Sequence, residues 1–367
     1  MTGQSCATER VIATLRAASD AEIATGVLQP ADIFVELAGE EFRKRLFTTE
    51  GANGERLCLR PDFTIPVCLE HLARGDTAPA IYSYNGKIFR KLRRDGSPEF
   101  EQAGSEWLGH PDTIETDADL FALASRCAAD VGLTGDQRAV VRVGDANLFS
   151  ALLHALNLSP AWVARLGAAY GDAVRMDAAL ARLKAPEAGN GIAGRLAPAL
   201  ARLEEGQARA IVEAVVGAGS VVGRSADDIA DRIIAEAASQ EDPEAARRIR
   251  TFLDLTAQLD RAADTLAAFA AAEGLDLSPA LDPFAARTAA LAAHGLDTSA
   301  ITFEAGFGRR LGYYTGFVFE MTAPGRPGAE VIAGGRYDRL IALLDAERSL
   351  PAIGFSVWLD RIPEAAA

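Results

Sequence analysis

Polar side chains with alternating spacing occupy a segment that is predicted to be a β-strand, Glu99 to Leu108. Side chains on a strand point alternately to its two faces, so Gln102, Gly104 and Glu106 face the same way. Gly104 has no side chain, and a gap of this kind lets a ligand lie against the backbone. The pattern indicates a binding surface for a polar ligand, and an exposed polar sheet face is the alternative.

A second polar group lies in the sequence LRPDFTIPV, where a strand is predicted to give way to a helix. Its charged and polar members are Arg60, Asp62 and Thr64. A junction of this kind can form the rim of a ligand site. Taken alone, Asp62 or Thr64 is better explained as a cap of the helix, because side-chain oxygens there accept from free backbone N–H groups.

A third group lies in FGRRLGYYTGFVFE, a glycine-punctuated segment that leads into an apolar strand. Its candidate residues are Arg309, Arg310, Tyr313 and Tyr314. Paired tyrosines usually belong to a core or an interface, and isolated arginines are usually solvated. The segment alone therefore has a structural explanation as well. The sequences GGRYDRLI and PAIGFSVWLDRI follow it.

The elements that position these groups follow from the spacing of apolar residues and from turn residues. The predicted strands are Arg56 to Leu59, Ala80 to Arg90, Glu99 to Leu108, Val140 to Val143, Ile301 to Phe307, Phe317 to Thr322, Glu330 to Ala333 and Ala352 to Val357. The predicted helices are Ala7 to Thr25, Thr64 to Leu72, and Asp117 to Val131 with Asp117 as its cap and Gly132 at its end.

The middle of the chain, from about Asp145 to Ser299, is rich in alanine and is predicted to be helical throughout. A helical insertion that interrupts an α+β domain with an antiparallel sheet explains this order better than repeated βαβ units do. The sequence GAGSVVG, at residues 217–223, resembles a dinucleotide-binding fingerprint but has one residue too many before its last glycine. We interpret it as a loop between helices.

Composition narrows the classes of function. The chain has 37 basic and 51 acidic residues and a net charge of −14, which disfavours binding to tRNA because neutralised phosphates supply most nucleic-acid affinity. No signal peptide or membrane-spanning run is expected. The four cysteines form no C-x-x-C pair and the histidines are far apart in the sequence, so we expect no metal site. Free thiols are expected instead, which is consistent with a reducing cytoplasm.

Together these segments resemble the class II aminoacyl-tRNA synthetase core, and specifically the histidyl-tRNA synthetase family. RPDFTIPV is similar to its amino-acid-binding motif, FR…FEQAGSE to its second signature motif, RRLGYYTGFVFE to its histidine-specific tyrosine motif, and GGRYDRL…AIGFSVWLDR to its third motif. The resemblance covers roughly residues 7–145 and 300–362. It implies a histidine site made of Asp62, Thr64, Arg90, Gln102, Glu106, Arg309, Tyr313 and Tyr314.

The resemblance also implies a role for each of these residues. Asp62, Thr64 and Gln102 are assigned to the α-amino group of the ligand, Glu106 and Tyr314 to its imidazole, and the two arginines to its carboxylate. Elementary chemistry agrees with this division, since an ammonium group needs acceptors, a carboxylate suits a guanidinium, and imidazole N–H groups suit a carboxylate or a phenol.

Departures from the family pattern affect the nucleotide region. Phe63 and Trp358 stand where the family has glycine, Leu92 and Gly312 where it has acidic residues, and Asp360 replaces a glutamate. An indole at position 358 is expected to obstruct the ATP region, since glycine there lets the backbone approach the nucleotide. The sequence also ends just after the third motif, without the anticodon-binding domain. We therefore expect no catalytic residues, no cofactor and no aminoacylation.

This truncated form resembles the regulatory subunits of short-form ATP phosphoribosyltransferase, which opens histidine biosynthesis. The resemblance implies a separate catalytic subunit as partner, a homodimer within a hetero-octamer, and L-histidine as inhibitory effector. We expect residues 1–145 and 300–367 to form the histidine-binding core and residues 146–299 the insertion. The alternatives are a minimal enzyme that forms histidyl-adenylate and an interaction protein with a vestigial pocket.

Overall fold

The computed structural model describes residues 3–38, 40–75, 78–91, 97–134, 138–184, 241–309, 313–326 and 330–362. Its strands are β1 (Ala21–Glu22), β2 (Leu28–Pro30), β3 (Thr48–Glu50), β4 (Arg56–Leu59), β5 (Ala80–Phe89), β6 (Glu99–Leu108), β7 (Val140–Asp145), β8 (Thr256–Gln258), β9 (Ile301–Glu304), β10 (Phe317–Thr322), β11 (Glu330–Arg336) and β12 (Ala352–Trp358).

The helices in the same ranges are α1 (Gly3–Ala17), α2 (Ala31–Ala38), α3 (Glu40–Arg43), α4 (Thr64–Arg74), α5 (Thr113–Asp130), α6 (Ala146–Ala155), α7 (Pro160–Ala169), α8 (Ala173–Lys184), α12 (Pro243–Leu253), α13 (Leu259–Glu273), α14 (Ser278–Ala293) and α15 (Arg339–Leu344), with the 3-10 turns η2 (Thr298–Ala300) and η3 (Leu359–Arg361). No helix in the described ranges is both long and apolar enough to cross a membrane.

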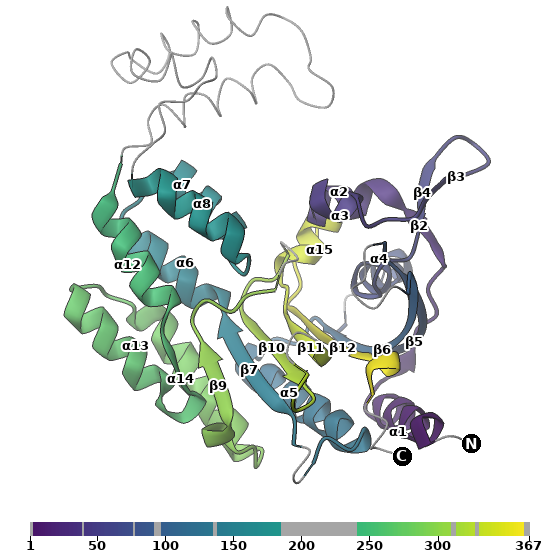
Figure 1. The fold of residues 1–367 in the computed structure, drawn as a ribbon. Helices are drawn as coiled ribbons and strands as arrows, with labels where there is room; N and C mark the ends of the chain where they lie inside the picture. The colour runs from purple at the N-terminus through teal and green to yellow at the C-terminus, as the bar shows by residue number, and fades with distance from the viewer. Residues whose placement is uncertain are drawn as a thin grey trace, which may run out of the picture.

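A nine-stranded sheet in the order β1-β5-β6-β12-β11-β10-β7-β9-β8 forms the centre of the molecule (Figure 1). Its pairings are antiparallel except those of β1 with β5 and of β7 with β9, so the predicted antiparallel sheet is in fact mixed at these two places. A smaller sheet, β2-β4-β3, lies beside it. The predicted α+β organisation is confirmed.

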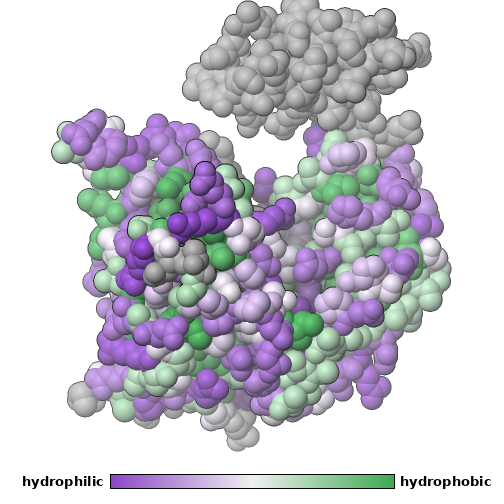
Figure 2. Space-filling model, turned by 180° about the vertical axis from the view of Figure 1, so that it is seen from behind, coloured by the Kyte–Doolittle hydropathy of each residue, from purple (hydrophilic) through white to green (hydrophobic). Residues whose placement is uncertain are grey.

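The large sheet separates two apolar clusters. Alternation along β12 shows the division, since Ile353 and Phe355 belong to one cluster and Ala352 and Trp358 to the other. The first cluster includes α1, α5 and the helices between β7 and β9, and the second includes α2, α4 and α15. On the face seen in Figure 2, hydrophobic residues occur in small patches among hydrophilic ones.

The elements around the polar segments were predicted well. Strands β4, β6 and β10 have the predicted bounds, and helix α4 begins at Thr64 as expected. The first helix was predicted to reach Thr25, and this is wrong. Helix α1 ends at Ala17, because the chain then pairs with β5 through hydrogen bonds from Asp20 N to Ile81 O (2.8 Å) and from Ile23 N to Ser83 O (2.8 Å).

The predicted start of the second long helix is also wrong. Helix α5 begins one turn earlier, and its N-cap is Asp112, whose carboxylate accepts from Glu115 N at 3.1 Å. Asp117 is buried instead, at 2% exposure. Gly132 ends this region with a φ of 78°, a left-handed conformation that favours glycine.

In its described part, the segment between β7 and β9 includes the strand β8, so it is not helical throughout as predicted. Strand β8 pairs with β9 at the edge of the large sheet. Helices α6 to α8 and α12 to α14 contribute to the same apolar cluster as the sheet itself, through residues such as Phe149, Phe252 and Phe284. The sequence GAGSVVG lies outside the described residues.

Candidate functional site

Glu106 lies in the middle of the sheet face that carries the second apolar cluster. The register of the strands places it between Tyr82 of β5 and Gly354 of β12. A side chain on Gly354 would collide with Glu106, since an added Cβ would lie 1.6 Å from Oε2. Thr64 Oγ1 donates to Glu106 Oε1 at 2.7 Å, and the Tyr337 hydroxyl donates to Oε2. The carboxyl group is therefore held from both sides.

Burial controls the protonation of Glu106, which is 1% exposed. Desolvation raises its pKa to about 8, against the opposing effect of the hydrogen bonds from Tyr337 and Thr64. The negative charge of Asp62 raises the pKa further. Near neutral pH this side chain consequently holds a proton for much of the time.

Asp62 and Gln102 present acceptor atoms to the same region. Asp62 Oδ1 accepts from Ile65 N at 3.4 Å, at the start of α4, so this side chain does lie at the helix end as the capping interpretation proposed. Asp62 Oδ2 and Gln102 Oε1 are buried and have no hydrogen-bond partner among the described residues. Burial raises the pKa of Asp62, and the charge of Arg90 opposes this shift.

Two arginines border the site. Arg90 Nε donates to Pro61 O at 2.6 Å, which fixes the loop before α4. Burial lowers the pKa of Arg90 to about 10, and the charge of Asp62 opposes the shift. Arg309 has its guanidinium carbon 5.6 Å from the centre of the Tyr314 ring, and its buried Nε has no partner among the described residues.

Three tyrosine rings form a group in this region. The centres of the Tyr313 and Tyr314 rings lie 4.9 Å apart, and they lie 5.9 Å and 6.4 Å, respectively, from the ring of Tyr337. Because Tyr337 also contacts Glu106, the tyrosine motif meets the strand motif at this point. The structure thus brings seven of the predicted residues into one region, from segments far apart in the sequence, and Gln102 lies on the same strand face as Glu106.

Two expectations about the site are wrong. Gly104 was expected to leave space for a ligand, but an added Cβ would lie 2.3 Å from the hydroxyl of Tyr84, which lies over it and hydrogen-bonds to Ser356 Oγ at 2.8 Å. Arg60 was a candidate for the ligand rim, but it is buried, donates from Nη1 to Thr25 O at 2.8 Å and stacks on Phe63 at 4.1 Å. Both residues support the surrounding structure.

Comparison with known proteins identifies the family. The histidyl-tRNA synthetase family model matches residues 7–215 and 224–362. An ATP phosphoribosyltransferase regulatory subunit of Mesorhizobium japonicum is 44% identical over 348 residues, covering 93% of this chain and 92% of the relative. The corresponding protein of Allorhizobium ampelinum is 42% identical over 357 residues, covering 95% and 94%. The chain belongs to the family of ATP phosphoribosyltransferase regulatory subunits.

Solved structures confirm the synthetase-like fold of this member of the regulatory-subunit family. An ATP phosphoribosyltransferase regulatory subunit/histidyl-tRNA synthetase from Bacillus halodurans aligns with a TM-score of 0.65 and 21% identity, covering 99% of this chain and 79% of the other. A histidine–tRNA ligase subunit from Alicyclobacillus acidocaldarius aligns with a TM-score of 0.61 and 23% identity, covering 99% and 92%.

Sequence reasoning missed several residues of the site in this regulatory-subunit fold. Tyr337 was noted only as part of GGRYDRLI, and nothing local predicted its contact with Glu106. The neighbouring Arg336 donates to Asp117 Oδ1 from Nη2 at 2.6 Å and from Nε at 2.8 Å. Arg287 of α14 also contacts Asp117, at 3.5 Å, and Asp145. This buried network connects the residue beside Tyr337 to the helices between β7 and β9.

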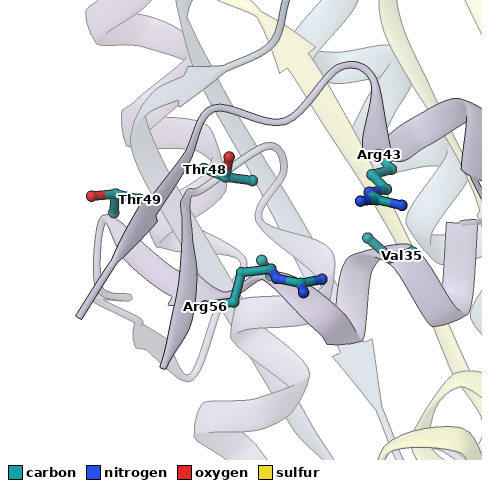
Figure 3. A pocket seen from close by; sticks show the side chains of 6 residues that line it. Val35, Arg43, Thr48, Thr49 and Arg56 are labelled. Carbon is teal, nitrogen blue, oxygen red and sulfur yellow. The ribbon is translucent and has the colours of Figure 1, made fainter. Parts of the chain in front are cut away.

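A surface cavity of about 270 Å³ lies elsewhere, on the smaller sheet (Figure 3). Its lining is Ala31, Val35, Arg43, Thr48, Thr49 and Arg56, which includes none of the eight predicted site residues. Arg56 forms an exposed ion pair with Asp32 at 3.1 Å. Exposed charges of this kind are well solvated, so the cavity offers a weaker ligand site than the buried group around Glu106.

Cysteine and metal-ligand chemistry adds little to the site. Cys58, Cys68 and Cys127 are buried free thiols, as predicted, whereas Cys6 is exposed. Burial raises the pKa of Cys58 to about 12, which makes this thiol unreactive.

Within the described ranges, the ligand atoms of Glu115, Asp119 and His294 lie within 4.8 Å of one another. All three residues are exposed, and His294 pairs with Glu115 at 2.8 Å.

Proposed function

We propose that this chain is a non-catalytic regulatory subunit that binds L-histidine at the Glu106 site and controls a separate ATP phosphoribosyltransferase catalytic subunit. One observation carries the proposal: among the eight predicted site residues, two buried acceptors, Asp62 Oδ2 and Gln102 Oε1, and one buried donor, Arg309 Nε, have no hydrogen-bond partner in the described part of the chain. An unsatisfied buried polar atom costs about 1–3 kcal/mol, so a ligand that pairs with all three is favoured. The zwitterion of an amino acid has the matching groups.

Each side chain has a distinct task in this proposal. Asp62, Thr64 and Gln102 accept from or orient the ammonium group, and Arg309 pairs with the carboxylate, assisted by Arg90. Glu106 and Tyr314 engage the imidazole, beside Tyr313. Because Glu106 is buried, an imidazole N–H gains a hydrogen bond to its carboxyl group that an amino acid without a polar side chain cannot form, and this provides selectivity.

The proposal of assembly with a catalytic subunit rests on the relatives, which are named as regulatory subunits of ATP phosphoribosyltransferase. We propose that this chain forms a homodimer within a hetero-octamer, located in the cytoplasm, and that the catalytic subunit depends on it for activity. Residues 1–145 and 300–367 form the histidine-binding core in this scheme, and residues 146–299 form the insertion. Histidine inhibits by favouring one state of the complex, for which a coupling free energy of about 1–3 kcal/mol is ordinary.

Calorimetry and reconstitution test the proposal. The isolated chain should bind L-histidine but not ATP, and the catalytic subunit should be nearly inactive alone, active with this chain and then inhibited by histidine. Saturable ATP binding without histidine binding would contradict the proposal, as would pyrophosphate exchange dependent on histidine and ATP.

The variant Arg309→Ala locates the feedback site. Its complex should keep much of the activity and resist inhibition, because the carboxylate of histidine loses its guanidinium partner. Histidine titrations of phosphoribosyl-ATP formation at matched subunit concentrations decide this. Equal inhibition of the variant and wild-type complexes would place the feedback site elsewhere.

A further inference from the structure

Trp358 is the last residue of β12 and lies directly opposite Gln102 of β6 in the register of the two strands. Their side chains lie on the same face of the sheet, where paired residues have Cβ atoms about 5 Å apart. The indole is buried, at 3% exposure, in the apolar cluster that also contains Tyr84, Tyr313 and Tyr337. Trp358 therefore lies beside Gln102, one of the predicted site residues.

The indole nitrogen has an unused donor. Among the described residues, Trp358 Nε1 is buried and has no hydrogen-bond partner. A tryptophan N–H usually finds a partner when it is buried, because it can only donate and loses water on burial. Trp107 on the neighbouring strand shows the usual arrangement, since its Nε1 donates to Ser105 Oγ at 2.9 Å.

Nearby charges hold the indole in place. The guanidinium carbon of Arg361 lies 4.9 Å from the centre of the Trp358 ring, a cation–π contact. Arg361 is itself fixed by Glu330, through a hydrogen bond to Glu330 O at 2.8 Å and an ion pair of 3.1 Å. A ring that is held in this way keeps its N–H direction, which suits a group that binds a ligand.

We infer that Trp358 donates its indole N–H to the carboxylate of the bound amino acid, beside Arg309. This inference rests on the proposed histidine site and adds a residue to it. The unpartnered buried atoms of the site then divide evenly, with two donors, Arg309 Nε and Trp358 Nε1, and two acceptors, Asp62 Oδ2 and Gln102 Oε1. That set complements both charged ends of an amino acid. The indole consequently contributes to binding, besides filling space on the nucleotide side.

The variant Trp358→Phe removes the N–H and keeps an aromatic ring. We expect its affinity for L-histidine to fall about tenfold, because a hydrogen bond to a charged group is lost. Histidinol, which carries a hydroxymethyl group in place of the carboxylate, should bind both proteins with nearly equal affinity. The matched control is Trp107→Phe, which loses a bond inside the protein and should bind histidine as the wild type does. Calorimetry with each ligand measures these affinities.

A second measurement uses the wild-type protein and does not depend on the folding of the Trp358 variant. In the chain labelled with ¹⁵N-tryptophan, the three indole signals are assigned with Trp107→Phe and Trp162→Phe. L-histidine should move the Trp358 indole N–H signal downfield, and histidinol should move it much less. Histidine binding with equal affinity in Trp358→Phe, or with an unmoved Trp358 signal, would overturn the inference and leave the histidine site standing. Absence of histidine binding to the wild type would overturn both.

Discussion

Tyr337 donates its hydroxyl hydrogen to Glu106 Oε2 across 231 positions of sequence, and both residues are 1% exposed. This contact joins the segment GGRYDRLI to the central strand of the site. The contact also affects the protonation of Glu106, because the hydrogen bond from Tyr337 lowers the pKa that burial raises. The orientation of the Glu106 carboxyl therefore depends on a residue outside the predicted site.

Replacing Tyr337 with phenylalanine should weaken histidine binding about tenfold, because Glu106 loses the donor that orients it, and a hydrogen bond of this kind contributes about 0.5–1.5 kcal/mol. Calorimetry measures the change. The control is Tyr170→Phe, whose hydroxyl donates to Ala305 O and Phe307 O at 3.0 Å each. It should lose stability and keep its affinity. Unchanged affinity in Tyr337→Phe would show that Thr64 alone orients Glu106.

The stability of the unliganded protein should fall as the pH rises from about 4.5 to about 8 through the titration of Glu106. The pKa of Glu106 in the folded protein, about 8, lies above the 4.5 that is usual for a glutamate, so the folded state binds a proton that the unfolded state has released. The contribution of this proton to the free energy of unfolding is complete below about pH 4.5, and it is lost as the pH rises through the pKa of Glu106 in the folded protein. Glu106→Gln should reduce this slope in urea denaturation series, whereas an unchanged slope would assign the dependence to other buried acids.

Replacing Gly354 with alanine should abolish most histidine binding, because the new Cβ would lie 1.6 Å from Glu106 Oε2 and would displace that carboxyl group. Gly167 of α7 provides the control, since nothing lies within 4 Å of an added Cβ there. Gly167→Ala should stabilise the helix by about 0.5–1 kcal/mol and leave binding unchanged. Calorimetry and thermal unfolding measure both effects. Wild-type affinity in Gly354→Ala would show that Glu106 tolerates the shift.

Replacing Asp117 with asparagine should lower the free energy of unfolding by about 3–5 kcal/mol, because two buried arginines lose their carboxylate. Arg336 and Arg287 are only 5% and 8% exposed in their side chains. Glu99→Gln removes an exposed partner of Lys87 and should change stability little, since solvent screens such pairs. Urea denaturation compares the two variants. A similarly small loss of unfolding free energy in both variants would show that Asp145 and Asp338 are sufficient to neutralise Arg287 and Arg336.

Local sequence determined the strands and helices that carry the site. Alternation along β6 placed Gln102 and Glu106 on one face, and the register with Trp358 and Gly354 confirms this arrangement. The spacing of apolar residues predicted helix α4 and placed Asp62 just before its first turn. These predictions succeeded because side-chain direction within one strand or helix depends on the backbone period alone.

Tertiary structure decided which polar groups became buried and with what partners. Asp117 has the residue type of a helix cap, yet Arg336 and Arg287, from distant parts of the chain, hold it inside the protein. Gly104 offers a gap in the sequence, and Tyr84 of the next strand fills it. Tyr337 and Trp358 reached the site only through the pairing of β12 with β6 and of β11 with β12. Such contacts depend on strand order and register, which no local pattern encodes. The sequence therefore predicted the polar residues of the candidate site, and the fold decided which residues surround them.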